Sequence, residues 1–406
     1  MNDSPNRLPL FRTTGTNLLR AKSHNHRVVL EVVRTQGPLS RADIARITAL
    51  SRQTVQNIVN ELQDEGLLEI GANRKRKTRG HPGNDVFFRP DGAFTLGFHL
   101  SQFALTSVVC NLAGEIRWSD EQRVAQPSVH DAAALMARIV ERARAGSGEG
   151  GQPRRLVGAG LAMPGPFGVT GMETGPTTLP DWPHPGAVDV ISAAIGMPLV
   201  LENDAAAAAM GEHLFGSGAG LGTFVYLYFG VGLGAGLFLN GSIYCGSGNN
   251  AGEIGHMIVE MDGRPCPCGN RGCLERYVSL QAICEVLDLG PPTRDTIEVI
   301  AGLYDADDKR LLSWLDEATG RLRQTINILE SAFDPETIII GGTLPQALLG
   351  ALKERLGALN ISIAQRKARS AERILLGSSG SQATARGAAA LAIQMHLAPN
   401  VDTLLI

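Results

Sequence analysis

The chain has 406 residues, 44% of them hydrophobic and 19% charged, and its mean hydropathy is +0.01. That length is enough for two or three domains with substantial cores. No apolar run approaches the length that spans a bilayer, which excludes a membrane-spanning protein and favours a cytoplasmic one. The formal net charge is −3, but residues 1–90 carry 15 Lys and Arg against 8 Asp and Glu, whereas the remainder carries 22 against 32. A basic head on an acidic body predicts that only the head meets a polyanion.

The head has the pattern of a helix-turn-helix. Apolar residues spaced for one helix face precede Gly37-Pro38, which ends the first helix. Ser40 is placed to cap a second helix over 41–47, and Ser51 to cap a third over 52–62. The outer face at the start of the third helix is polar, as expected for a helix that enters a major groove. The side chains predicted to contact DNA from here are Ser51, Arg52, Gln53, Thr54, Gln56 and Asn57.

A basic segment follows at 74–83, between a strand that begins near Leu67 and another at 86–88. Two strands around a basic tip are typical of a wing, whose charges would contact phosphate in salt-sensitive binding. A solvated loop is the alternative for any basic run, but the position after a helix-turn-helix favours DNA binding by residues 23–88. The tip residues predicted to contact DNA are Arg74, Arg76, Arg79, Gly80 and His81, the last three in a minor groove.

From Phe94 onward, strands alternate with helices, which predicts an α/β body with two lobes that flank a cleft. Strands are expected at 94–100, 105–110, 156–163, 199–202, 223–229, 236–239 and 337–340, and helices at 131–145, 188–195, 318–333 and about 385–396. The expected division is a tail (1–22), a winged helix-turn-helix (23–90), lobe 1 (91–205) and lobe 2 (206–406), with the last helix able to return to lobe 1.

Three of the six cysteines, Cys266, Cys268 and Cys273, fall within eight residues, and His256 precedes them. Three thiolates and one imidazole form a complete tetrahedral set for Zn²⁺ and leave no position for water, so the metal is expected to be structural. The first pair is spaced CxC rather than the commoner CxxC. Two alternatives are buried free cysteines in a glycine-rich loop and a disulfide, which the CxC spacing disfavours.

Several motifs occur together in one order along the chain. After the winged helix-turn-helix come Leu201-Glu-Asn-Asp-Ala205, Ala251-Gly-Glu-Ile-Gly-His256, the CxCGxxGCLE run that ends at Glu275, and Phe333-Asp-Pro-Glu with Ile340-Gly-Gly342. The combination resembles the ROK family (repressors, open reading frames and kinases) over nearly the whole chain. The resemblance implies a two-lobed, actin-like sugar-kinase body. It also implies a DNA-binding head like that of the family's repressors, such as those that respond to xylose or N-acetylglucosamine.

The resemblance also implies roles for individual residues. Asn203 and Asp204 match the family's sugar-contacting pair, in which the aspartate is the catalytic base of kinase members. Glu253, His256 and Glu275 match further ligands of sugar hydroxyls, and His256 also matches the histidine of a zinc site completed by the three cysteines. Carboxylates and amides suit the recognition of vicinal hydroxyls, and a histidine held by zinc through one nitrogen presents the other in a fixed direction. Without these motifs, Asp204 and Glu275 could be helix caps and Glu253 a surface charge.

Kinase members carry two phosphate-binding loops, and only one is kept in outline here, at Gly230–Gly236. In place of the Asp-x-Gly-Gly-Thr of the first loop, this chain has His99-Leu100-Ser101-Gln102-Phe103. An imidazole cannot replace the carboxylate that positions Mg²⁺, and side chains at 101 and 102 would block the close approach of Mg-ATP. We therefore expect no enzyme activity, with Asp204 the vestige of a catalytic base.

The expected function is a sugar-responsive transcriptional regulator, a repressor of a carbohydrate uptake or catabolism operon. Its expected partners are double-stranded operator DNA, a monosaccharide or sugar-derivative effector, and further copies of the chain in a homodimer or homotetramer. One alternative is an active ATP-dependent sugar kinase with a DNA-binding head. Another is a DNA-binding protein whose body binds protein partners instead of sugar.

Overall fold

The computed structural model describes residues 18–72, 84–124, 127–146, 154–166, 182, 186–357, 359–364 and 371–397. The chain divides into two compact units, Met1–Ala93 with Ile393–Ile406, and Phe94–Ala392. We call the first the head and the second the body. Among the described residues, no helix is both long enough and apolar enough to cross a membrane.

The head packs α1 (Leu18–Gln36), α2 (Arg41–Thr48) and α3 (Arg52–Asp64) around a small apolar core. The predicted caps are present: Ser40 Oγ accepts the backbone N–H of Asp43, and Ser51 Oγ accepts that of Thr54. An antiparallel sheet completes the fold in the order β1 (Leu39–Ser40), β3 (Asn84–Phe88), β2 (Leu68–Ala72). The short strand β1 was not predicted, and α1 begins at Leu18, before the start expected for the winged helix-turn-helix at residue 23.

The first sheet of the body has the order β6 (Ile116–Arg123), β5 (Ala104–Asn111), β4 (Phe94–Leu100), β7 (Leu156–Met163), β8 (Leu199–Asn203). Strands β4, β7 and β8 are parallel, whereas β5 and β6 are antiparallel to their neighbours. All of β4 and β5 is buried, but exposure along β6 alternates between half-buried and exposed residues, as on an edge strand.

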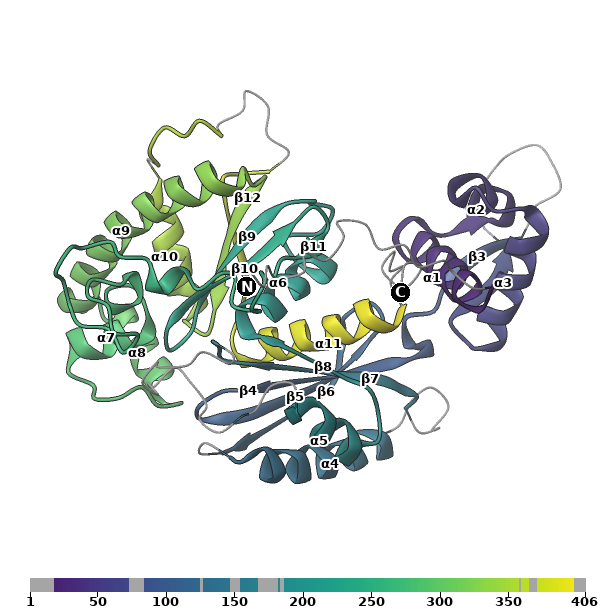
Figure 1. Ribbon diagram of the computed structural model, residues 1–406, viewed down its shortest axis with the longest axis horizontal. Coiled ribbons are helices and arrows are strands. Elements are labelled where there is room, and N and C mark those ends of the chain that lie inside the picture. The colour runs from purple at the N-terminus through teal and green to yellow at the C-terminus, as the bar shows by residue number, and fades with distance from the viewer. Residues whose placement is uncertain are drawn as a thin grey trace, which may run out of the picture. The chain divides into compact units, whose positions relative to one another are not determined.

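Helices cover both faces of this sheet. The helices α4 (Val129–Ala145) and α5 (Gly186–Ile195) lie together on one face, and α11 (Ser381–Leu397) lies on the other (Figure 1). Two glycines let α11 approach the strands. A Cβ at Gly97 would lie 1.8 Å from the carbonyl oxygen of Ala385, and a Cβ at Gly160 would lie 1.9 Å from that of Ala388. The predicted C-terminal helix therefore packs against β4 and β7.

The second sheet has the order β11 (Ser242–Ile243), β10 (Leu233–Leu239), β9 (Phe224–Phe229), β12 (Thr337–Gly342), β13 (Ile374–Ser379). Residues of β9 alternate between two cores. One core holds Val225 and Leu227 against helices α7 (Leu280–Leu287), α8 (Thr296–Asp305), α9 (Lys309–Phe333) and α10 (Gln346–Leu356). The other holds Phe224 and Tyr226 against α6 (Asp204–Phe215) and α11. The body is thus two lobes, each built on one sheet.

The prediction of a phosphate-binding loop over Gly230–Gly236 is partly wrong, because strand β10 already begins at Leu233. A Cβ at Gly236 would lie 2.3 Å from the carbonyl oxygen of Ala205. That glycine is therefore required for helix α6 to pack on the strand, and only residues 230–232 form the turn between β9 and β10.

Candidate functional site

A cavity of about 270 Å³ opens between the two sheets of the body. Two sequence segments at the ends of first-sheet strands reach it: 164–166 directly after β7, and 203–204, where β8 ends and α6 begins. Ligands of α/β proteins bind outside the carboxyl ends of parallel strands for the same geometric reason. The cavity is lined by all of the predicted sugar-binding residues, Asn203, Asp204, Glu253, His256 and Glu275.

Asn203 and Asp204 are fixed by the start of α6. The Oδ1 atoms of both residues accept the backbone N–H of Ala205 at 2.8 Å. Asn203 is the N-cap, so its amide group remains able to donate to a ligand, and Asp204 is the first helical residue rather than the cap. The helix N-terminus thus holds an amide and a carboxylate side by side at the cavity wall.

Glu253 reaches the cavity because of the glycine before it. Gly252 has φ +95°, which favours glycine, and a Cβ there would lie 1.9 Å from the carbonyl oxygen of Ala235 in β10. The side chains of Asn203 and Glu253 meet beside Gly165, where an added Cβ would lie 2.7 Å from Asn203 Nδ2 and 3.2 Å from Glu253 Oε1. Residues from three separate segments therefore converge on one point.

The carboxyl groups in this corner have shifted pKa values. Burial raises the pKa of Asp204 to about 7, and the nearby Glu253 adds to the rise. Burial likewise raises the pKa of Glu253 to about 7, with a further contribution from Glu275. Near neutral pH these groups can therefore either accept or donate a hydrogen bond, which suits a ligand made of hydroxyl groups.

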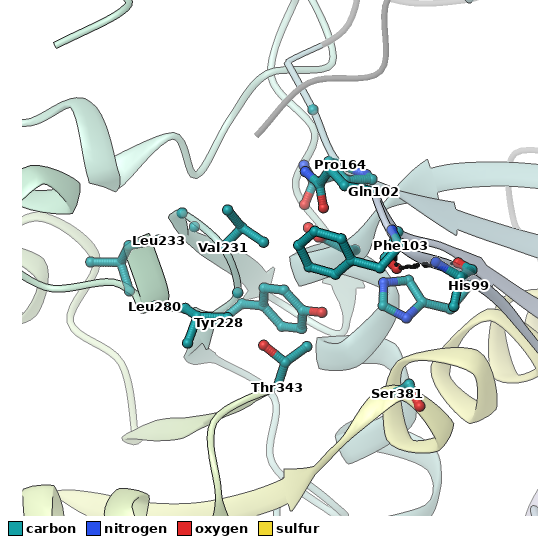
Figure 2. Close-up of a pocket in the computed structure, with 18 of the residues that line it drawn as sticks. His99, Gln102, Phe103, Pro164, Tyr228, Val231, Leu233, Leu280, Thr343 and Ser381 are labelled. Atoms are coloured by element: carbon teal, nitrogen blue, oxygen red, sulfur yellow. Dashed lines mark hydrogen bonds between the residues drawn. The ribbon is translucent and has the colours of Figure 1, made fainter. Parts of the chain in front are cut away.

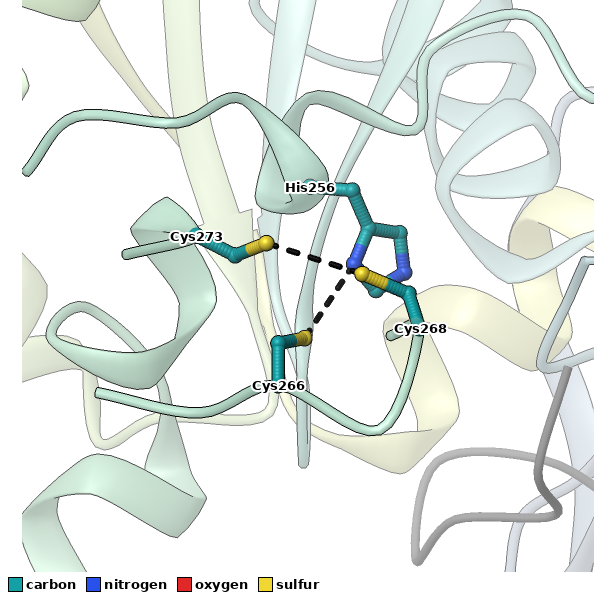
Figure 3. A group of neighbouring side chains, drawn as sticks. All are labelled: His256, Cys266, Cys268 and Cys273. Carbon is teal, nitrogen blue, oxygen red and sulfur yellow. Dashed lines mark hydrogen bonds between the residues drawn. The ribbon is translucent and has the colours of Figure 1, made fainter. Parts of the chain in front are cut away.

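The cysteine cluster adjoins the same cavity. The sulfur atoms of Cys268 and Cys273 lie 3.6 Å apart, and Cys266 Sγ lies 3.6 Å from His256 Nδ1. All four ligand atoms lie within 4.8 Å of one another (Figure 3). Ligands around a tetrahedral Zn²⁺ at about 2.0–2.3 Å are separated by about 3.3–3.8 Å. The donor set and its spacing can therefore hold a metal ion, and the disulfide alternative is wrong because every cysteine is a free thiol.

His256 belongs to both the cluster and the cavity. Its Nδ1 faces the sulfur atoms, and its side chain also lines the cavity. Glu275 Oε1 lies 3.4 Å from that Nδ1 and 3.3 Å from Cys266 Sγ. Glu275 is in the short 3₁₀ turn η4 (Leu274–Arg276), and Ser279, not Glu275, caps the helix α7. The cluster therefore reaches the cavity through His256, and Glu275 lies between the two.

The cavity is also lined by the turn between β4 and β5, at Ser101, Gln102 and Phe103. Ser101 Oγ accepts the backbone N–H groups of Phe103 and Ala104 at 3.3 and 3.1 Å. Those two donors therefore point into the turn. Figure 2 shows the Phe103 ring lying in the pocket near Val231 and Tyr228.

Sequence reasoning missed several residues that line the cavity far from any motif. Glu121 comes from the edge strand β6, Arg294 from the segment before α8, and Ser381 from the start of α11. Glu121 forms an ion pair with Arg294 and accepts a hydrogen bond of 3.1 Å from Ser381 Oγ. Neither β6 nor α8 was predicted, so no signal placed these groups at the cleft.

In the head, the predicted DNA-contacting residues of α3 lie near its N-terminus. Gln53 Nε2 donates to Asn57 Oδ1 at 3.0 Å, and Gln56 Nε2 donates to Asn60 Oδ1 at the same distance. Arg52, Gln53 and Asn57 are exposed. Ser51 Oγ is bonded to Thr54, so these two residues form the helix cap. The predicted wing-tip residues Arg74, Arg76, Arg79, Gly80 and His81 lie outside the described residues.

Comparison with known proteins agrees with this architecture. The MarR family matches residues 22–77. The xylose repressor of Bacillus subtilis (strain 168) is 24% identical over 377 residues, which cover 93% of this chain and 96% of that protein. The DNA-binding transcriptional dual regulator NagC of Escherichia coli (strain K12) is 26% identical over 346 residues, which cover 80% of this chain and 82% of that protein.

Solved structures show the same fold. A ROK family transcriptional regulator, a homolog of the E. coli MLC protein, superposes with a TM-score of 0.73 at 23% identity, covering 95% of this chain and 99% of its own. A ROK family glucokinase from Streptomyces griseus, in complex with glucose and AMPPNP, superposes with a TM-score of 0.58 at 26% identity, covering 74% of this chain and 100% of its own. The head is a MarR-like winged helix and the body a two-lobed, actin-like sugar-kinase fold. The ROK family model matches residues 104–395, which is well over half of the chain. The chain therefore belongs to the ROK family.

Proposed function

We propose that this protein is a sugar-responsive transcriptional repressor of a carbohydrate uptake or catabolism operon. The observation that carries the proposal is the presence, in one chain, of a winged helix and a body cavity where an amide and several carboxyl groups converge. Relatives named as a xylose repressor and as NagC align with this chain over most of their length. The proposed division is a head (23–90), a first lobe (91–205) and a second lobe (206–406), with α11 packed on the first.

The proposed effector site is the corner of the cavity built by Asn203, Asp204, Glu253, His256 and Glu275. The amide of Asn203 donates, and the carboxyl groups accept or donate, so vicinal hydroxyls of a sugar can each find a partner. Effector binding changes operator affinity because the sugar binds more tightly to one of two conformations of the protein. A sugar with equal affinity for both would have no effect.

We propose that His256, Cys266, Cys268 and Cys273 bind a structural Zn²⁺. The ion supplies a rigid centre that joins the segment after β10 to the turn before α7. Zinc bound through Nδ1 would leave Nε2 of His256 facing in a fixed direction. The described geometry supports this role because His256 belongs to both the cluster and the cavity, and Glu275, which also lines the cavity, contacts Cys266 Sγ.

For DNA binding, we propose that α3 enters the major groove and that the wing contacts phosphate and the minor groove. Two heads of a homodimer or homotetramer would then read the two half-sites of a pseudo-palindromic operator. Operator binding should be steeply salt-dependent, because the head's excess of Lys and Arg would displace counterions from DNA.

The second candidate function is an ATP-dependent sugar kinase, favoured by Asp204 at the position of the family's base and by structural neighbours that include a glucokinase. Against it, Ser101 Oγ accepts the backbone N–H groups of Phe103 and Ala104, and the Phe103 side chain lies in the pocket beside them. A coupled assay of ADP release with Mg-ATP and a panel of sugars separates the two. We expect no sugar-dependent ADP release. Turnover that disappears in Asp204→Asn would make the kinase the correct function.

A further inference from the structure

The part of the cavity around Phe103, Val231 and Ile297, which we call the apolar half, is unlike a sugar site. The rings of Phe103 and Tyr228 and the side chain of Val231 lie around the same space in Figure 2. A site for a free monosaccharide needs hydrogen-bonding groups over most of its surface, because a sugar carries hydroxyls on nearly every carbon. The apolar side chains that line the cavity as a whole are Phe103, Val231, Leu233, Leu280 and Ile297.

One polar group in this half lacks a partner. His99 is 2% exposed, and among the described residues no hydrogen-bond partner faces its Nδ1. Burial lowers the pKa of His99 to about 4, against the opposing effects of Glu121 and the Ser381 backbone, so the imidazole is neutral at physiological pH. A buried, neutral ring nitrogen without a partner can satisfy one uncharged group of a ligand.

The charges around the cavity disfavour an anion. Arg294 is the one Lys or Arg among the described residues that line it, and it is already paired with Glu121. A phosphate group placed here would meet carboxylates without a free cation, and like charges in a partly buried site repel strongly. The carboxyl groups that line the cavity are those of Glu121, Asp204, Glu253, Glu275 and Glu298.

We propose that the effector is an uncharged sugar that carries an apolar substituent, such as an alkyl or aryl glycoside. The sugar ring occupies the corner of Asn203 and Asp204, and the substituent occupies the apolar half, with one neutral oxygen placed to hydrogen-bond His99. This inference rests on the proposed function, since it names the class of effector for the same cavity. It distinguishes this protein from one that senses a sugar phosphate.

The test compares matched probes by isothermal titration calorimetry on the full chain. The probes are xylose, glucose and N-acetylglucosamine, the phenyl α- and β-glycosides of each, and the 6-phosphates of the two hexoses. At least one phenyl glycoside should bind about tenfold more tightly than its free sugar, since burying a phenyl ring in the apolar half outweighs the ordering that it requires. Each 6-phosphate should bind at least tenfold more weakly than its neutral sugar.

Two variants on the same helix then locate the substituent. Ile297→Asp places a carboxylate in the apolar half, whereas Val299→Asp makes the same kind of change at a position that is 46% exposed and outside the cavity lining. Ile297→Asp should reduce the preference for the phenyl glycoside to less than twofold and leave the affinity for the free sugar unchanged. Val299→Asp should leave both affinities unchanged.

Two results would overturn the inference while leaving the proposed function intact. One is a free sugar that binds as tightly as all of its phenyl glycosides, and the other is a 6-phosphate that binds most tightly of all. If no sugar, glycoside or phosphate binds, the proposed function itself is wrong, and the inference fails with it. A preference for the glycoside that survives Ile297→Asp would show that the substituent lies elsewhere.

Discussion

Glu121 and Arg294 form an ion pair that joins the two lobes of the body at the rim of the cavity. Glu121 lies on the edge strand β6 of the first sheet, and Arg294 lies two residues before α8, beside the second sheet. Thr106 Oγ1 and Ser381 Oγ also donate to the Glu121 carboxylate, at 3.2 and 3.1 Å. The two lobes are thus tied by a polar clasp, by which we mean Glu121 and Arg294.

We predict that the clasp stabilises the body by about 0.5 kcal/mol, because the Arg294 side chain is 44% exposed and solvent screens the pair. The coupling energy between Glu121→Gln and Arg294→Gln, measured by urea denaturation in a double-mutant cycle, should equal this stabilisation. A matched control is Asp120, the preceding residue, whose Oδ1 lies 2.9 Å from Arg142 Nη2 within the first lobe. Effector affinity should fall in Glu121→Gln but not in Asp120→Asn; equal effects on effector binding would contradict a clasp.

The clasp should also weaken in acid. Burial raises the pKa of Glu121, but hydrogen bonds from Arg294 and Ser381 outweigh it and leave the pKa below its usual value. A carboxyl whose pKa is lowered by folding adds stability above its unfolded pKa and loses it as the pH falls through the folded pKa. The difference in stability between wild type and Glu121→Gln should therefore be full at neutral pH and disappear in acid. A difference that grew towards low pH would contradict this.

Asp204 should lower the stability of the effector-free protein at neutral and alkaline pH. Its pKa is raised to about 7, so the folded state holds a proton that the unfolded state has lost between about pH 4 and pH 7. The contribution of this group to the free energy of unfolding therefore falls as the pH rises through that window, and it is constant at higher pH. Asp204→Asn should raise the free energy of unfolding at pH 8 on the order of 1 kcal/mol while abolishing effector binding. Asp189→Asn, at an exposed position on α5, should change neither.

Removal of one thiol should separate the metal site from the DNA-binding head. Cys268→Ser should lose about one equivalent of zinc by elemental analysis and weaken the effector response, because the cluster holds His256, which lines the cavity. Binding of DNA without effector should remain. Cys245→Ser, a half-buried cysteine outside the cluster, should keep its zinc. If the variant lost its zinc and kept its effector affinity, the cluster would stabilise the fold without supporting the effector site.

Operator recognition should depend on the N-terminal part of α3. Gln53→Ala removes an exposed side chain held by Asn57, and should cost about 1–3 kcal/mol of discrimination at the base pair that it contacts. Gln63→Ala, an exposed residue near the other end of the same helix, should have little effect. Electrophoretic mobility shift with promoter DNA and with unrelated DNA of the same length measures both. Equal losses on both DNAs would assign Gln53 to phosphate contacts instead.

The grouping of His256 with the three cysteines and the start of α6 could be predicted from sequence because their chemistry is local. Three cysteines close together need only a tight turn to meet, and Asn203 with Asp204 mark a helix start in any fold. The cap belongs to Asn203 rather than Asp204, which a pattern alone does not decide.

The far side of the cavity could not be predicted. Strand β6 is polar along most of its length and lacks a run of β-branched residues, since an edge strand is held by its pairing with β5 rather than by a buried face. Glu121 and Arg294 are 173 residues apart, and only the closure of the two lobes brings them together. The glycines after β9 resembled a phosphate loop, although Gly236 is required for the packing of α6.

The most direct test of the account is fluorescence anisotropy of labelled DNA from upstream of the gene and its neighbouring operons, titrated with the protein in the presence and absence of a sugar or glycoside that calorimetry shows to bind. The account predicts that saturating effector lowers operator affinity at least tenfold in the wild type and leaves it unchanged in Asp204→Asn. A protein that binds its effector tightly and yet holds operator DNA with unchanged affinity would contradict it.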